Sequence, residues 1–185
     1  MIPAREEDMN NNTFVHKYIR SLITKDDITV DMTAGNGNDT LLLARLSKKV
    51  YAFDVSKQAI DNTKERIKDY DNVVLINDSH ANAEKYVKEK VRLFIFNLGY
   101  LPGSDQTSIT KADVTLEAFK KACGLHEEGG YIVITFYIKQ KGGLDEYYLL
   151  SDHINKNRFQ ITETYRQDKP FSPITWIIRK ISRAH

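Results

Sequence analysis

The chain has 185 residues, of which 41% are hydrophobic and 28% are charged, and its net charge is +2. This composition is ordinary for a globular domain with a real core, which excludes a disordered or fibrous chain. No apolar run approaches the roughly 18 residues of a membrane span, and the first residues lack the apolar centre of an export signal. The single cysteine, Cys123, excludes an intramolecular disulfide and is expected to be a packing residue. We therefore expect a cytoplasmic protein, without a metal site because no His-rich or Cys-rich spacing occurs.

Segments typical of strands alternate with segments typical of helices along most of the chain. Residues 1–12 are polar and are expected to form a flexible segment ahead of one domain at 13–185. Apolar periodicity and capping residues predict helices at 13–23, 38–47, 56–69, 81–89, 110–125 and 144–154. Between them, strands are predicted at 28–32, 50–53, 73–76, 91–96 and 131–138, with 73–76 fully buried and a long loop at 97–108. Such alternation predicts an α/β fold with a doubly wound parallel sheet.

The end of the chain departs from this alternation of strands and helices. Two consecutive strands are predicted at 159–165 and 174–178, and the connection between them is too short for a helix. They are expected to form an antiparallel hairpin at the edge of the sheet. From Arg166 onwards there are five basic residues against one acid, namely Arg166, Lys169, Arg179, Lys180 and Arg183 against Asp168. This cluster is either a solvated face or a surface that contacts phosphates.

Ten residues, from Asp31 to Thr40, connect the first predicted strand to the following helix with the sequence Asp-Met-Thr-Ala-Gly-Asn-Gly-Asn-Asp-Thr. Gly35 and Gly37 can adopt positive φ and let backbone N–H groups approach a ligand at the carboxyl end of the strand. A bare G-x-G turn can also bind nothing. Asp54, which lies nineteen residues after Gly35, ends the next strand, where a carboxylate can accept both hydroxyls of a ribose. This spacing favours a nucleoside cofactor.

The residues of this turn also indicate which cofactor binds. A dinucleotide site has a third small residue where this chain has Thr40, and Asp39 would repel a pyrophosphate. An acid-rich turn without a phosphate-binding lysine suits the cationic sulfonium and ammonium of S-adenosylmethionine. The turn resembles the first motif of class I methyltransferases, and Asp31, Gly35, Gly37 and Asp39 are its predicted cofactor contacts. The resemblance implies a Rossmann-like, seven-stranded sheet with the order 3-2-1-4-5-7-6 and a C-terminal antiparallel hairpin.

Two further strand ends should meet the same ligand, because parallel strands place their carboxyl ends at one edge of the sheet. After the third strand, Asp78, Ser79 and His80 are candidates for binding adenine, although they could simply form the turn into a helix. After the fourth strand, Asn97-Leu-Gly-Tyr100 resembles the Asn-Pro-Pro-Tyr motif of amino-directed methyltransferases. There Asn97 would accept protons of a nucleophilic amine, together with the Leu98 carbonyl, and Tyr100 would stack on a planar base. The alternative is a strand-end loop with no catalytic role.

Taken together, these motifs resemble those of the small bacterial methyltransferases once labelled rRNA methylases, above all in Asn97-Leu-Gly-Tyr-Leu-Pro-Gly103. The resemblance implies N-methylation of 5-aminomethyl-2-thiouridine at the tRNA wobble position, with the anticodon region of tRNA as partner. It implies amine positioning near Asn97 and Tyr100, and cofactor contacts from Asn36, Asn38, Asp54, Ser56, Ser79 and His80. Relatives often carry Gly-His-x-Gly-Gly after the fifth strand, where this chain has Lys139-Gln-Lys-Gly-Gly143. The role of that histidine is therefore vacant or held by Lys139 or Lys141.

The sequence leaves the substrate and the catalytic base undecided. An aminomethyl group is protonated at neutral pH, as a lysine is, so the site must favour the neutral amine by burial or through a base, for which Asp105 is the candidate. Alternatives are methylation of another amino group, on an rRNA base, a protein or a small amine, or a non-catalytic module that binds S-adenosylmethionine. The sequence leaves the oligomeric state, including a homodimer, undecided.

Overall fold

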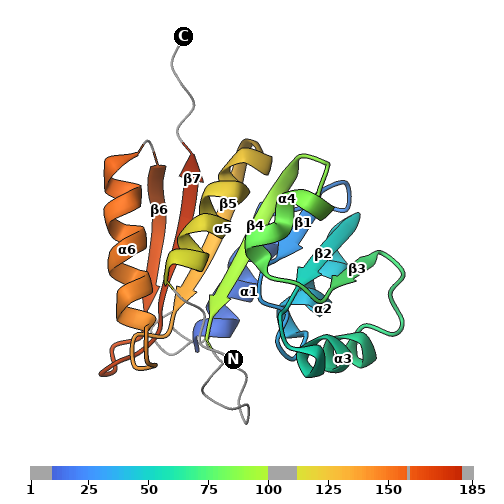
Figure 1. The fold of residues 1–185 in the computed structure, drawn as a ribbon, viewed down its shortest axis with the longest axis horizontal. Coiled ribbons are helices and arrows are strands. Elements are labelled where there is room, and N and C mark those ends of the chain that lie inside the picture. Colours follow the sequence, from blue (N-terminus) through green and yellow to red (C-terminus); the bar gives the residue numbers. More distant parts are fainter. Residues whose placement is uncertain (1–9, 100–111, 158, 181–185) are drawn as a thin grey trace, which may run out of the picture.

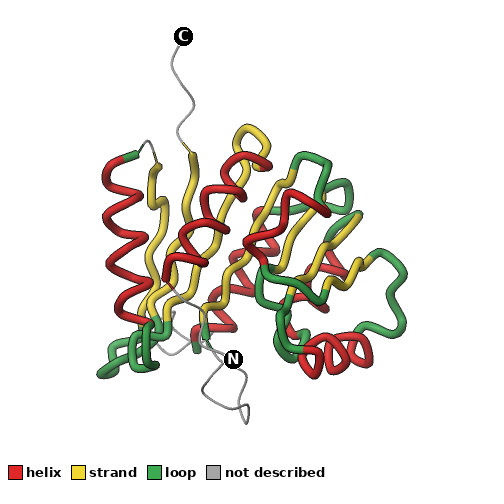
Figure 2. Tube along the Cα trace, in the orientation of Figure 1, coloured by secondary structure: helices red, strands yellow, loops and turns green. Residues whose placement is uncertain are grey.

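The strands and helices form a sheet with helices on both faces, as the alternating pattern requires (Figures 1 and 2). The computed structural model describes residues 10–99, 112–157 and 159–180. Seven strands pair in the order β3-β2-β1-β4-β5-β7-β6, which confirms the predicted fold class. The strands are β1 (Ile28–Asp31), β2 (Lys49–Phe53), β3 (Val73–Ile76), β4 (Val91–Leu98), β5 (His126–Phe136), β6 (Phe159–Arg166) and β7 (Ile174–Lys180). The first five are parallel, and β7 runs antiparallel to both β5 and β6.

The helices divide between the two faces of the sheet (Figure 1). On one face lie α4 (Ala83–Tyr86), α5 (Ala112–Leu125) and α6 (Gly143–Lys156), and on the other α1 (Asn11–Leu22) and α2 (Asn38–Leu46). Helix α3 (Lys57–Arg66) follows β2, and a 3-10 turn, η2 (His80–Asn82), precedes α4. Within the ranges that the structure describes, none of the helices has the length and apolarity that crossing a bilayer needs.

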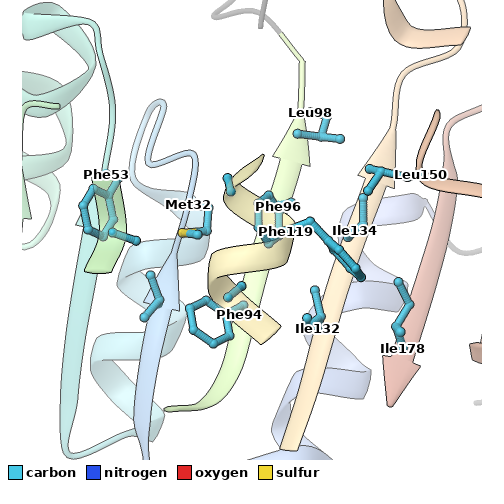
Figure 3. Packing of buried hydrophobic residues seen from close by; sticks show 14 of the residues in the cluster. Met32, Phe53, Phe94, Phe96, Leu98, Phe119, Ile132, Ile134, Leu150 and Ile178 are labelled. Atoms are coloured by element: carbon cyan, nitrogen blue, oxygen red, sulfur yellow. The ribbon is translucent and has the colours of Figure 1, made fainter. Parts of the chain in front are cut away.

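Aromatic and branched side chains of the central strands form the larger of two cores (Figure 3). Phe94 and Phe96 of β4 are fully buried and lie close to Phe119 of α5 and Ile134 of β5. Cys123 packs against the edge of this cluster, as expected of a packing residue. Phe94 and Phe96 belong to this core, whereas Leu93 and Ile95 belong to the second core on the other face, so the apolar run of β4 is covered on both faces of the sheet.

Helix α1 packs against strands from the end of the chain. It begins at Asn11, two residues earlier than predicted, because the Asn10 side chain accepts a hydrogen bond from the Thr13 amide at 2.9 Å. The Phe14 ring stacks on Tyr165 of β6 with the ring centroids 4.0 Å apart. On β7, the Thr175 hydroxyl donates to Asn11 Oδ1 at 2.8 Å. Helix α1 therefore covers a face of the sheet.

Three sequence-based element predictions were wrong in detail. Strand β3 is not fully buried: it is the last strand of the sheet, and Val74 is 40% exposed. The helix predicted at 81–89 is only η2 followed by one turn, because the backbone becomes extended at Val87, whose side chain is buried in the core ahead of β4. Strand β5 begins at His126, ahead of the Gly129-Gly130 pair, which forms an irregularity in the pairing with β4.

Two of the C-terminal basic residues, Arg166 and Arg179, lie far apart along the hairpin. In the hairpin, Arg166 pairs with Ile174 at one end, whereas Arg179 pairs with Gln160 towards the other end. Arg179 lies near the Tyr131 ring, with its guanidinium carbon 5.7 Å from the ring centroid. The side chain of Lys180 and the whole of Arg183 lie outside the described residues. Arg166 and Arg179 therefore lie towards opposite ends of the hairpin, and the interpretation of the basic tail as a surface that contacts phosphates stays a prediction.

The contrast between β4 and β3 gives a stability test. Phe94→Ala leaves a cavity in the closed core and is expected to lower the free energy of unfolding by about 3–5 kcal/mol. Val74→Ala on the exposed edge strand is the matched control and should change it by no more than about 0.5 kcal/mol. Urea denaturation followed by circular dichroism measures both. Equal losses in the two variants would contradict this account of the core.

Candidate active site

The carboxyl group of Asp31 is buried beneath the glycine turn. It is completely inaccessible to solvent, and it accepts hydrogen bonds from the Thr33 amide at 3.0 Å and from the Thr40 hydroxyl at 2.6 Å. Burial raises the pKa of Asp31 to about 7, and the nearby charge of Asp39 adds to this effect. Both carboxylate oxygens are thus engaged by groups of the turn itself, so the predicted cofactor contact of Asp31 stays a prediction.

The turn packs tightly against α3. Gly37 has a φ of +76°, and a Cβ atom there would lie 3.0 Å from Thr63 Cα, so only glycine fits without strain. The Thr63 hydroxyl donates to the Gly35 carbonyl at 3.2 Å, and Arg66 Nε donates to the Asn36 carbonyl at 2.5 Å. These contacts hold the turn against α3. Asn38 is the exposed first residue of α2.

Asp54 connects the turn to the end of β2. Its carboxylate accepts the Gly35 amide and the Ser56 amide, each at 2.9 Å, one on each oxygen. The Ser56 hydroxyl in turn caps α3 by accepting from the Ala59 amide at 3.3 Å. Each oxygen of Asp54 keeps a further lone pair, and the side chain is only partly buried, so it can accept the hydroxyls of a ribose.

At the end of β3, Asp78 organises the loop while His80 lies beneath it. Asp78 accepts from the Ser79 amide at 2.7 Å and from the side chains of Asn82 and Tyr86 at 3.0 and 2.8 Å, and these bonds lower its pKa. His80 Nδ1 lies 2.9 Å from the Met32 carbonyl, so Nδ1 carries the proton and Nε2 is an acceptor. Burial lowers the pKa of His80, and among the described residues Nε2 has no partner.

The end of β4 holds Asn97 in a fixed orientation. Its backbone amide donates to the Thr33 hydroxyl at 2.8 Å, and its side-chain Nδ2 donates to Asp39 Oδ2 at 3.1 Å. The Asn97 amide oxygen is buried and, within the described part of the chain, accepts no hydrogen bond. An acceptor buried without a partner is costly, which marks this oxygen as a group available to a ligand donor.

Tyr137 and Gln140, which follow β5, lie next to Asn97 and Gly99. Neither residue was predicted from the sequence. Tyr137 is hydrogen-bonded to the Asn97 side chain, and burial together with the Asp39 charge raises the pKa of its hydroxyl. A Cβ atom on Gly99 would lie 3.1 Å from the Tyr137 ring and 3.2 Å from Gln140 Oε1. Gln140, rather than Lys139 or Lys141, therefore lies against the end of β4, while both lysines are exposed. Tyr100 and Asp105 lie outside the described residues.

These groups fit S-adenosylmethionine. A partly exposed carboxylate is available to a ribose. Two acceptors without partners among the described residues, His80 Nε2 and Asn97 Oδ1, lie at the start of η2 and at the end of β4. Three carboxylates, those of Asp31, Asp39 and Asp54, interact electrostatically around the turn, which suits a cationic ligand. Among the described residues, no group of three or more His, Cys, Asp or Glu side chains is placed to hold a metal ion.

Comparison with known proteins decides the family. The family model described as "Putative rRNA methylase" matches residues 50–180. The chain belongs to this family. Among solved structures, the chain is similar to a protein described as a "putative methyltransferase from streptococcus mutans in complex with SAH", with 36% identity, a TM-score of 0.85 and coverage of 94% of this chain and 99% of that one. A "putative rRNA-methylase" from Clostridium thermocellum has 34% identity, a TM-score of 0.84 and coverage of 94% and 98%.

A curated relative, the chloroplastic tRNA (mnm(5)s(2)U34)-methyltransferase of Arabidopsis thaliana, is 37% identical over 147 residues, which cover 71% of this chain and 54% of the relative. The chain thus spans about half the length of this relative. As a member of the rRNA methylase family, with a neighbour that holds SAH, the protein is a methyltransferase that uses S-adenosylmethionine. When bound, this cofactor supplies an electrophilic methyl group on a sulfonium sulfur.

Removal of the Asp54 carboxylate tests the prediction that this group binds the ribose. Asp54→Ala deletes charge-assisted hydrogen bonds worth about 1.5–3 kcal/mol each, so affinity for S-adenosylmethionine should fall at least about tenfold. Calorimetric titration measures the affinity. Asp61→Ala on the exposed side of α3 is a matched control that should bind like the wild type. Unchanged affinity in Asp54→Ala would place the ribose elsewhere.

The buried Asp31 predicts a pH dependence of stability. Its pKa is raised from 3.8 to about 7, so the native state holds the proton more tightly than the unfolded state does. The stability of the wild type relative to Asp31→Asn should therefore fall as the pH rises from about 4 to about 7. Denaturant unfolding at a series of pH values measures this difference. A wild type that gains stability over the variant across this range would show that the carboxyl group is instead stabilised in its charged form.

Proposed function

We propose that this methyltransferase converts 5-aminomethyl-2-thiouridine to 5-methylaminomethyl-2-thiouridine at the wobble position of tRNA. The Arabidopsis relative, whose name states a tRNA (mnm(5)s(2)U34)-methyltransferase, supports tRNA as the substrate. The proposal for the amine rests on the chemistry at the end of β4, where the Asn97 amide oxygen has no hydrogen-bond donor among the described residues.

The observation that carries this proposal is the orientation of Asn97. A primary amine attacks a methyl group through its lone pair, and acceptors that bind its N–H groups aim that lone pair. Asn97 Oδ1 is such an acceptor, since Nδ2 is already bonded to Asp39. Because the sulfonium already activates the methyl group, alignment of the amine is the main contribution left to the protein.

The amine must also lose its extra proton before it reacts. An aminomethyl group resembles a lysine amine, whose pKa is about 10.4, and an ammonium ion has no lone pair. A buried site favours the neutral amine, and a base completes the transfer. Asp105 is proposed as this base and Tyr100 as the platform on which the uracil ring stacks, in keeping with the resemblance to the Asn-Pro-Pro-Tyr motif.

Replacement of Asn97 separates catalysis from cofactor binding. Asn97→Ala should leave affinity for S-adenosylmethionine nearly unchanged and slow methyl transfer by about 10²-fold, as expected for one lost positioning contact. The assay is transfer of labelled methyl to tRNA that carries the aminomethyl group, with nucleosides identified by mass spectrometry. Tyr100→Phe, which keeps the ring, should be mild, whereas Tyr100→Ala should weaken tRNA binding.

Two outcomes would overturn the proposal. Full activity of Asn97→Ala would remove the residue from the reaction. A wild type that methylates ribosomal RNA or a protein but no tRNA would assign the same site to another amino group. Nucleoside analysis of tRNA from cells lacking the protein provides the independent check, because the aminomethyl form should then accumulate.

A further inference from the structure

A chain of side-chain contacts leads from the surface to Asn97. His16, on α1, has its Nε2 atom 2.7 Å from Asp39 Oδ1, and Asp39 Oδ2 accepts from Asn97 Nδ2 at 3.1 Å. The side chain of His16 is 30% exposed and that of Asp39 is 12% exposed. Three elements that are separate in sequence, α1, α2 and β4, thus meet at one carboxylate. Both His16 and Asp39 precede the segment at 50–180 that the family model matches.

The carboxylate determines which end of the Asn97 carboxamide points at it. A carboxylate only accepts hydrogen bonds, so it selects the NH2 end and turns the oxygen away. The Asn97 oxygen has no partner among the described residues, so the hydrogen bond between Asn97 and Tyr137 is also made by the Asn97 side-chain nitrogen. A flipped carboxamide would place two acceptor oxygens against each other. The observed orientation is therefore maintained by the identity of residue 39.

His16 holds that carboxylate in place. A hydrogen bond that involves a charged group is shorter and stronger than a neutral one, and the 2.7 Å distance is in this range. With one oxygen bonded to His16, Asp39 presents the other to Asn97. Without the imidazole, the Asp39 side chain is free to adopt another rotamer, and the orientation of Asn97 loses its support.

We propose that His16 is a positioning residue for methyl transfer, which acts through Asp39 to keep the Asn97 carboxamide oxygen directed at the substrate amine. This inference rests on the proposed function in so far as Asn97 acts on an amine. Helix α1 thereby contributes to catalysis although it carries none of the cofactor-binding segments.

The kinetic test compares variants at each link. His16→Ala should lower kcat about tenfold with little change in the KM for S-adenosylmethionine. Asp39→Asn, whose carboxamide can bond to either orientation of Asn97, should lower kcat further, towards about 10²-fold. His16→Gln, whose amide N–H can replace the imidazole N–H, should recover most of the loss. The control is Tyr18→Phe, which removes another hydrogen bond of α1, to Glu163 on β6, and should behave like the wild type.

A spectroscopic readout makes the inference independent of the substrate. The side-chain NH2 signals of Asn97 in ¹⁵N–¹H spectra, assigned by their absence in Asn97→Ala, should shift in His16→Ala and in Asp39→Asn but not in Tyr18→Phe. Unshifted signals, or wild-type kcat in both His16→Ala and Asp39→Asn, would overturn the role of His16. A wild type that methylates no amine on tRNA, with the Asn97 signals shifted as expected, would instead refute the proposed function and leave the contact chain standing.

Discussion

The buried carboxyl group of Asp31 is the contact on which the rest of the site depends. It binds the two threonines that flank the glycine turn, at 3.0 Å through the Thr33 amide and at 2.6 Å through the Thr40 hydroxyl. Thr33 in turn accepts the backbone amide of Asn97, and Thr40 fixes the first turn of α2, from which Asp39 reaches Asn97. The Asp31 carboxyl group, which has no contact with solvent, thus sets both the path of the glycine turn and the position of Asn97, the catalytic candidate.

Much of the fold was predictable, because hydrophobic periodicity and glycine turns are local signals. The strand order was predicted from the resemblance to class I methyltransferases, and the alternating helices and strands alone predicted only a doubly wound sheet with a terminal hairpin. Exposure was less predictable, because it depends on where a strand lies in the sheet. The run Val73 to Ile76 has the composition of a buried strand, yet as the last strand it exposes Val74. The positions of Arg166 and Arg179, towards opposite ends of the hairpin, likewise depend on the register of β6 and β7.

Some residues of the candidate site were likewise predictable from the sequence, whereas others were not. Residues in or next to a strand-end motif, such as Asp54, His80 and Asn97, could be found from spacing, because a doubly wound sheet brings such ends together. His16 and Tyr137 could not, since each reaches the site through a tertiary contact that no local pattern encodes. Gln140 could have been found by aligning the residues ahead of Gly142-Gly143 with the family's Gly-His-x-Gly-Gly, in which it occupies the histidine position.

The docking of α1 has a consequence for the order in which the protein matures. This helix is synthesised first, but Phe14 and Asn11 find their partners on β6 and β7, which are synthesised last. A nascent chain that has reached β5 contains the glycine turn, Asp54 and Asn97, but it lacks β6 and β7, which provide part of the surface against which α1 packs. Contacts of such long sequence separation form late, because the intervening loop must close first. The docking of α1 is therefore completed only after β6 and β7 have been synthesised, although α1 itself is made first.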